Sequence, residues 1–126
     1  MNEYAKMIKE AITKLNLTIV EEDSESIVVR FQMQKVFIYL PTDDFPFVDI
    51  MSSALEDVDD SNFSAALEKC NTMNNRLKMV KCFVNEDILV TSTEFYFLGF
   101  DDLCSQIEKS LMALVCARVL FRKLGK

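Results

Sequence analysis

The sequence predicts a single α+β domain over residues 1–126, with three helices packed on an antiparallel sheet of five to six strands. Two observations lead to this prediction. Strand-like segments come in neighbouring pairs joined by short polar turns, which is typical of antiparallel hairpins. Three segments with helical spacing then need a sheet face to cover. We expect the order α-β-β-β-(β)-α-β-β-α, which forms no parallel crevice where a nucleotide would bind.

The first half of the chain contributes one helix and up to four strands. Residues 2–15 predict a helix, because apolar side chains recur every three or four positions. The segments 17–23 and 26–33 are rich in β-branched residues and predict a hairpin. A further strand, 35–41, follows after barely a residue of turn and ends at a proline. Residues 47–55 have an ambiguous period, so we favour a strand and leave a short helix open.

The second half begins with an acidic run that leads into a helix. Residues 61–78 predict this second helix, which Asp60 or Ser61 would cap. Two strand-like segments, 78–84 and 88–97, follow with a three-residue polar turn between them. We expect them to form a second hairpin.

The last helix is expected to begin at residues 99–101, with Asp101 as its cap, and to run to about Leu124. Its second half, residues 112–121, is apolar almost all round and is broken only by Arg118. About twenty residues are needed to cross a bilayer, so this segment must face protein on both sides. It is either a central core helix, or a helix with one face toward a partner. The expected interface residues, which would join two copies of the chain, are Met112, Val115, Val119 and Arg122.

The charge and the cysteines limit the classes of partner and the compartment. Twenty acidic residues against fourteen basic ones make a surface that repels phosphate and anionic lipid, so we exclude nucleic acid and membrane. The N-terminal segment lacks the pattern of a signal peptide, which predicts a cytoplasmic protein. The four cysteines have no metal-ligand spacing, and we expect free thiols in the core at Cys70, Cys82, Cys104 and Cys116.

Catalytic and metal sites find little support in the sequence. The chain has no histidine and only two glycines, so we predict no enzyme, no phosphate loop and no cofactor. One pattern matches positions one, three, five and twelve of a calcium-binding loop, at Asp57, Asp59, Ser61 and Glu68. Asn62 occupies the position of the turn glycine, so we interpret the acidic residues as favourable charge at a helix N-terminus and predict no metal.

The asparagines of the second helix are its most informative polar residues. The helical period places Asn74 on the apolar face, where an amide must find hydrogen-bond partners. That face otherwise consists of Phe63, Ala66, Leu67, Cys70, Met73 and Leu77. We interpret Asn71 and Asn74 as structural polar residues that bond to backbone groups. The alternative is a small-ligand sensor in which Asn74 orients a ligand within an apolar pocket formed by Phe31, Phe37, Tyr39, Phe83 and Phe95.

The order of elements and the stretch EKCNTMNNRLKMVKCFVNEDILVTSTEFYF, residues 68–97, resemble the YbjN-like family, whose fold is that of type III secretion chaperones. In that family the second helix ends in an Asn-x-x-Asn element before a basic strand-forming segment. Asn71 and Asn74 match this element, and Lys78 and Lys81 follow it. The resemblance implies a compact domain that pairs into dimers and, for its chaperone relatives, binds an extended segment of another protein.

The function that we expect is therefore a non-catalytic protein-binding module, chaperone-like or regulatory, that forms a homodimer through its last helix. Its partner would be another protein, whose identity the sequence does not give.

Overall fold

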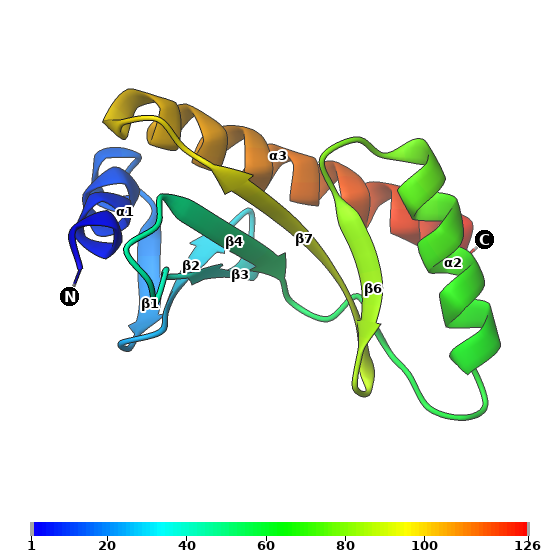
Figure 1. The fold of residues 1–126 in the computed structure, drawn as a ribbon. Helices are drawn as coiled ribbons and strands as arrows, with labels where there is room; N and C mark the ends of the chain where they lie inside the picture. Colours follow the sequence, from blue (N-terminus) through cyan, green and yellow to red (C-terminus); the bar gives the residue numbers. More distant parts are fainter. Residues whose placement is uncertain (1, 126) are drawn as a thin grey trace.

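The computed structural model describes residues 2–125, in which three helices cover one face of a curled seven-stranded antiparallel sheet (Figure 1). The helices are α1 (Glu3–Lys14), α2 (Phe63–Arg76) and α3 (Phe100–Leu124). The strands are β1 (Thr18–Glu22), β2 (Ser26–Phe31), β3 (Gln34–Tyr39), β4 (Phe47–Ser52), β5 (Glu56–Asp57), β6 (Lys81–Asn85) and β7 (Ile88–Tyr96). The α+β class is confirmed, and the sheet has one strand more than expected, the two-residue β5.

The strand β7 organises the sheet because it has neighbours on both sides. The order runs β1-β2-β3-β4-β7, and all pairs are antiparallel. Both β4 and β6 pair with Ser92, so they lie on opposite edges of β7. The short β5 pairs with Ile88 and Leu89 on the edge away from β6, and thus continues the line of β4.

The ambiguous segment after the second proline is a strand, as we favoured. Along β4 the buried side chains of Val48 and Ile50 alternate with Phe47, Asp49 and Met51. Because side chains of a strand point to alternate faces, the first pair faces the helices and the other three residues face away. This strand therefore carries polar and aromatic groups onto the uncovered face of the sheet.

One continuous core lies between the sheet and the helices. The alternation within each strand places branched aliphatic side chains against the helices, and these residues are almost completely buried. From the strands they are Ile27, Val29, Val36, Ile38, Val48, Ile50 and Leu89. From the helices they include Ile8, Ile12, Met73, Leu103, Ile107 and Leu111.

The predictions of the residues that cap the N-termini of α2 and α3 are wrong. Helix α2 begins after Asn62, which makes no side-chain cap, and neither Asp60 nor Ser61 takes that role. Ser61 is instead bonded, through its backbone N–H and its hydroxyl, to the carboxylate of Asp59. Helix α3 begins after Gly99, whose φ of 86° lies in the left-handed region that favours glycine, so Asp101 does not cap it.

The apolar face of α2 is only partly buried. Ala66, Cys70 and Met73 pack into the core as expected, whereas Phe63 and Leu67 are exposed. Figure 1 shows the reason, because α2 stands at the end of the sheet beside β6, and only one side of it meets the rest of the protein.

Candidate functional site

The sheet face opposite the helices, which we call the open face, holds the most distinctive surface of the protein. Tyr39, Asp49 and Glu94 form one row across β3, β4 and β7, and Phe47 pairs with Tyr96 in the row beside it. Val28 and Val90 also point to this face, yet they are only 4% and 1% exposed. Their cross-strand partners on the same face are Phe37 and Phe83, large side chains that lie beside them.

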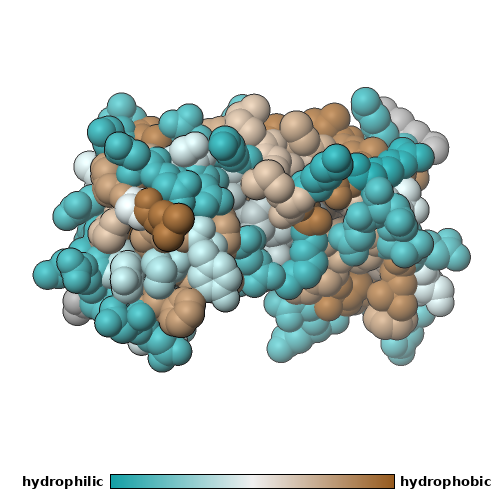
Figure 2. Space-filling view, turned by 45° about the horizontal axis from the view of Figure 1, so that its top comes forward, coloured by the Kyte–Doolittle hydropathy of each residue, from teal (hydrophilic) through white to brown (hydrophobic). Residues whose placement is uncertain are grey.

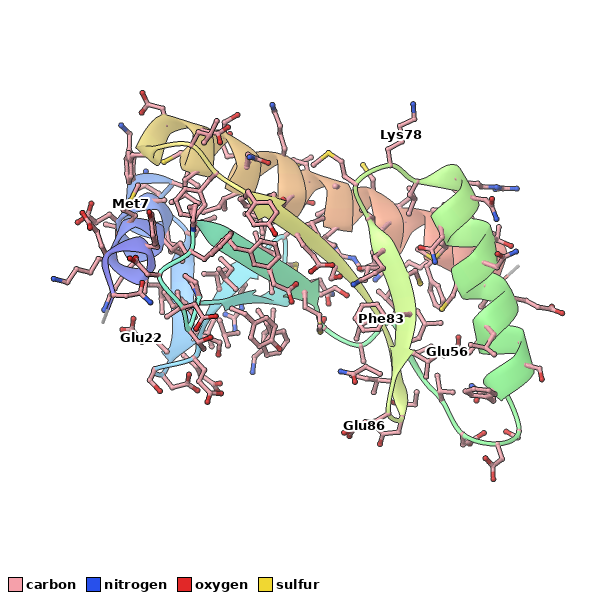
Figure 3. All side chains as sticks on the ribbon, in the orientation of Figure 1. Met7, Glu22, Glu56, Lys78, Phe83 and Glu86 are labelled. Atoms are coloured by element: carbon pink, nitrogen blue, oxygen red, sulfur yellow. The ribbon has the colours of Figure 1, made fainter. Side chains whose placement is uncertain are left out.

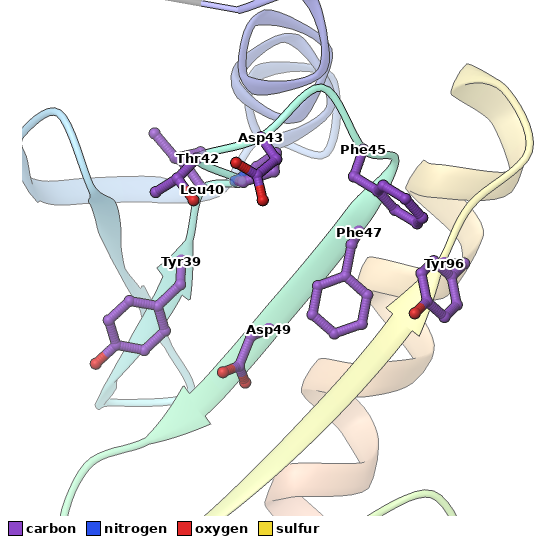
Figure 4. Close-up of a pocket in the computed structure, with 9 residues that line it drawn as sticks. Tyr39, Leu40, Thr42, Asp43, Phe45, Phe47, Asp49 and Tyr96 are labelled. Atoms are coloured by element: carbon purple, nitrogen blue, oxygen red, sulfur yellow. The ribbon is translucent and has the colours of Figure 1, made fainter.

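A cavity of about 410 Å³ lies on the open face, and we call it the aromatic pocket (Figure 4). Its walls come from β3, β4, β7 and the loop between the first two. The lining residues are Tyr39, Leu40, Pro41, Thr42, Asp43, Phe45, Phe47, Asp49 and Tyr96. The ring of Tyr96 lies 5.6 Å from that of Phe45 and 5.0 Å from that of Phe47, centroid to centroid, in tilted geometry. A volume in this range suits a ligand or a few side chains of another protein.

The aromatic pocket is open to solvent on its outer side. Tyr96 is 63% exposed and Phe45 is 54% exposed, although aromatic side chains are large and gain much from burial. Exposed rings that cluster around a hollow mark a surface that another molecule covers.

A carboxylate lies within this aromatic surface. Burial raises the pKa of Asp49, the neighbouring Glu94 raises it further, and Lys81 opposes the shift. Burial also raises the pKa of the Tyr39 hydroxyl, and the charge of Asp49 adds to that effect. Lys81 forms its own ion pair with Glu94, with the Nζ and Oε1 atoms 2.7 Å apart. The Oδ1 atom of Asp49 is buried and has no hydrogen-bond partner.

Two parts of the sheet have a strand edge without a neighbouring strand, namely β1 and the C-terminal part of β7. The edge strand β1 carries Glu21 and Glu22, and its pairing is interrupted by an irregularity, both of which hinder the addition of another strand. On β7, pairing with β6 ends at Ser92, so within the described residues the stretch 93–96 has a neighbouring strand on one side only. Gln106 Nε2 donates to the carbonyl oxygen of Tyr96 at 2.8 Å. That carbonyl is therefore already bonded, and residues 93–95 are the part of β7 beside the aromatic pocket that has one neighbouring strand.

The residues expected at an interface lie on the outer side of α3. Met112 is 48% exposed, Val119 is 46% exposed, and Arg122 is exposed as well, while Val115 is half-buried near Phe31. Cys116 is a further exposed side chain on the outer side of α3. Figure 2 shows apolar surface interrupting the hydrophilic surface along the upper part of the molecule, where α3 lies. The second half of α3 therefore faces the core on one side and solvent on the other.

The two asparagines differ in their surroundings. Asn74 accepts a hydrogen bond from the Cys82 N–H at 2.7 Å and donates one to the Cys82 carbonyl at 3.0 Å. The residue is exposed, so the expectation of a buried amide is wrong. Its side chain reaches from the rim of α2 to the outer edge of β6. Asn71 is exposed, and its carbonyl accepts a hydrogen bond from Asn75 Nδ2 at 2.8 Å.

The aromatic residues expected to form a ligand pocket with Asn74 do not surround one cavity. Phe31 and Phe95 pack against the core, whereas Phe37, Tyr39 and Phe83 belong to the open face. Figure 3 shows Phe83 on β6, on the strand that leads to the hairpin turn at Glu86. Of the five, Tyr39 alone lines the aromatic pocket.

The calcium-like pattern shows ordinary loop geometry. Hydrogen bonds from the Ser61 hydroxyl and backbone lower the pKa of Asp59. Asn62 bonds Asp59 N–H and the Asp57 carbonyl, both at 2.8 Å. Within residues 2–125 no group of three or more acidic or cysteine side chains is placed to hold a metal ion.

The four cysteines are free, and they occupy unlike places. Cys70 and Cys82 are buried with their Sγ atoms 3.5 Å apart. Cys104 is partly buried and packs against the core, whereas Cys116 is exposed, so the expectation that all four thiols lie in the core is wrong for Cys116. Among the helices described, none is both long and apolar enough to traverse a bilayer.

Residues 2–108 match the model of a family described as "TY-Chap1: T3SS (YopN, CesT) and YbjN peptide-binding chaperone 1". No curated protein matches the sequence.

Solved structures share the fold. YbjN from E. coli superposes with a TM-score of 0.71 at 11% identity, over 95% of this chain and 92% of that one. An uncharacterized protein from Methanothermobacter thermautotrophicus gives 0.63 at 16% identity, over 95% and 97%. The Yersinia pestis type III secretion chaperone SycH, in complex with a stable fragment of YscM2, gives 0.62 at 14% identity, over 94% and 98%. The fold expected from the resemblance is therefore confirmed.

Proposed function

Because the chain belongs to the family of type III secretion and YbjN peptide-binding chaperones, we propose that it holds an extended segment of a partner protein on the open face of its sheet. The observation that carries this proposal is the aromatic pocket, whose exposed rings lie beside the stretch of β7 that has a neighbouring strand on one side only. One domain, residues 1–126, would bind the segment without a reaction or a cofactor. It places the binding in the cytoplasm, where the free thiols stay reduced.

The geometry favours a chain over an enclosed small molecule. One side chain of the segment would fill the pocket, between Tyr96 and the loop before β4, while the flanking residues cross the open face. Backbone groups of β7 beyond Ser92 would bond to the same segment, as in other proteins that bind peptides along a strand. A small-ligand site would bury most of its ligand, whereas this pocket leaves Tyr96 largely exposed.

An array of overlapping peptides from unrelated denatured proteins tests this function. We expect the protein to bind a subset of them, and Tyr96→Ser to weaken binding by about tenfold or more, because stacking on exposed rings is lost. Leu98→Ser is the matched control, since Leu98 is exposed and lies outside the pocket. Absence of binding to every peptide, or equal binding by the Tyr96 variant, would contradict the proposal. A thermal-shift screen with metabolites tests the small-ligand alternative.

We further propose that two copies pair through the outer side of α3. Met112, Val119 and their half-buried neighbour Val115 give a neutral apolar strip next to Arg122, and such a strip is self-complementary when two helices meet. Sedimentation should show a dimer for the natural chain and a folded monomer for Val119→Glu. Ser105→Glu, at an exposed polar position of the same helix, should leave the dimer intact. A natural chain that stays monomeric at high concentration would refute this pairing.

A further inference from the structure

We infer that the aromatic pocket selects a cationic side chain, arginine above all, from the segment that the protein binds. This inference rests on the proposed function, because it names the chemistry of the residue that the pocket accepts. Three features support it. The pocket contains a carboxylate without a hydrogen-bond partner, the nearby lysine is already ion-paired with another carboxylate, and aromatic rings surround the site.

The first feature is the carboxylate of Asp49. Three buried side-chain oxygens lack a hydrogen-bond partner within the described residues, on Asp49, Thr93 and Ser110. Only Asp49 is charged and lines a pocket. Its Oδ1 atom is buried without a donor, while the residue as a whole is only partly buried and lines the pocket, so a donor could approach the rest of the carboxylate from the pocket side. A guanidinium or ammonium group placed there would supply that donor and the opposite charge.

The second feature is the arrangement of the protein's own charges. Lys81 is the cation that acts on Asp49, but it is paired with Glu94 at 2.7 Å. Asp43 adds a further carboxylate to the pocket wall. Arg30 and Lys35 also lie on the open face. They are neighbours across β2 and β3, at the end of β3 opposite to Tyr39 and the pocket. The surroundings of Asp49 are therefore net negative.

The third feature is the set of rings. A cation over an aromatic face is attracted by the ring, and the planar guanidinium group also stacks on it. Elsewhere the protein uses its own lysines in this way, over Phe100, Phe121 and Phe83. Within residues 2–125 no such pair involves Phe45, Phe47 or Tyr96. Figure 4 shows Asp49 between Tyr39 and Phe47, so one guanidinium could contact both the carboxylate and a ring.

A neutral apolar side chain would fit this pocket less well. It would cover the rings but would also take the remaining water away from Asp49 and leave the carboxylate without a donor. Burying a charge in that way opposes binding. The pocket should therefore distinguish arginine from citrulline, which has nearly the same shape and no charge.

The test titrates N-acetyl-arginine amide and N-acetyl-citrulline amide into the ¹⁵N-labelled natural chain. We expect the arginine compound to shift the amide signals of Phe47, Asp49 and Tyr96, with an affinity about tenfold or more above that of the citrulline compound. Asp49→Asn should remove this preference. Asp44→Asn should keep it, since Asp44 is an exposed carboxylate in the loop before β4 that does not line the pocket.

Equal affinity for the two compounds, no shifts with either, or a preference that survives Asp49→Asn would overturn the inference. The result is separate from that of the peptide array. Peptides that bind through Tyr96 without any basic residue would leave the proposed function standing and would contradict the arginine preference.

Discussion

Replacing Asp49 with asparagine is expected to stabilise the protein at neutral pH. In the folded state burial and Glu94 raise the pKa of Asp49 above its ordinary value of 3.8, and Lys81 offsets only part of this. In the unfolded chain the carboxyl group ionises at that ordinary value. At neutral pH the folded protein therefore carries a charge that water would stabilise better, and this destabilisation is fully present.

The expected gain is about 1 kcal/mol in the free energy of unfolding. Asparagine keeps an oxygen at the same position, so the gain comes only from removal of the charge. It lies at the lower end of the ~1–3 kcal/mol that an unpaired buried polar group costs, because Asp49 is only half-buried and solvent screens its charge. For a chain of this size the gain corresponds to a rise of about 4 °C in the melting temperature. Asparagine keeps the shape of the side chain, so little of the packing changes.

The stability gain of Asp49→Asn should depend on pH. As the pH falls through the raised pKa, the folded protein takes up a proton at Asp49, and below the ordinary value both states are neutral there. The gain from Asp49→Asn should shrink over this range and vanish near ~pH 3.5. Urea unfolding at neutral and acidic pH measures it, with Asp44→Asn as the control for general charge effects. A variant that is less stable at neutral pH, or a gain that persists on acidification, would refute the reasoning.

Two further predictions concern α2 and the thiols. Asn74→Ala should lower the free energy of unfolding by about 1–2 kcal/mol and speed hydrogen exchange in β6, because both bonds to Cys82 are lost, while Asn71→Ala should change stability by less than about 0.5 kcal/mol. Equal effects of the two variants would contradict this. In the monomeric Val119→Glu variant, a thiol reagent should modify Cys116 first, since it is exposed, whereas burial raises the pKa of the Cys82 thiol and should keep it unreactive until urea unfolds the protein. Mass spectrometry of the modified sites decides the order.

The fold was predictable because its elements have strong and regular periods. The strand β2 illustrates this, since Ile27 and Val29 face the core and alternate with Val28 and Arg30. The two-residue β5 has no period to read and exists because β7 is long enough to pair beyond β4. The prediction of the residue that caps α2 was wrong for a local reason. Asp59 bonds to Ser61 before the helix begins, and this competes with capping.

The aromatic pocket was not predicted, although its signal was present. The sequence predicts Phe31 and Tyr39 in one pocket, but the two-residue turn at Gln32 and Met33 places them on opposite faces of the sheet. The spacing of Phe47 and Asp49 within β4 implies that these two share a face, and the register of β3 with β4 adds Tyr39 to it. What the sequence could not supply is the pairing of β4 with β7, which brings Tyr96 from a distant segment to complete the pocket.

The two proposed surfaces lie on opposite faces of the sheet, which bears on how the protein would work. Helix α3 packs on the covered face, and Figure 4 shows the pocket residues on the other side of β4 and β7 from it. A dimer through α3 would therefore leave both pockets free. Isothermal titration should give two peptides per dimer with the same intrinsic affinity as the monomeric Val119→Glu variant. On a surface dense in immobilised peptide, the natural dimer should dissociate at least about tenfold more slowly than the Val119→Glu monomer. While one copy is bound, it keeps the other copy close to a second immobilised peptide. One peptide per dimer, or peptide binding that drives the copies apart, would mean that the two surfaces compete.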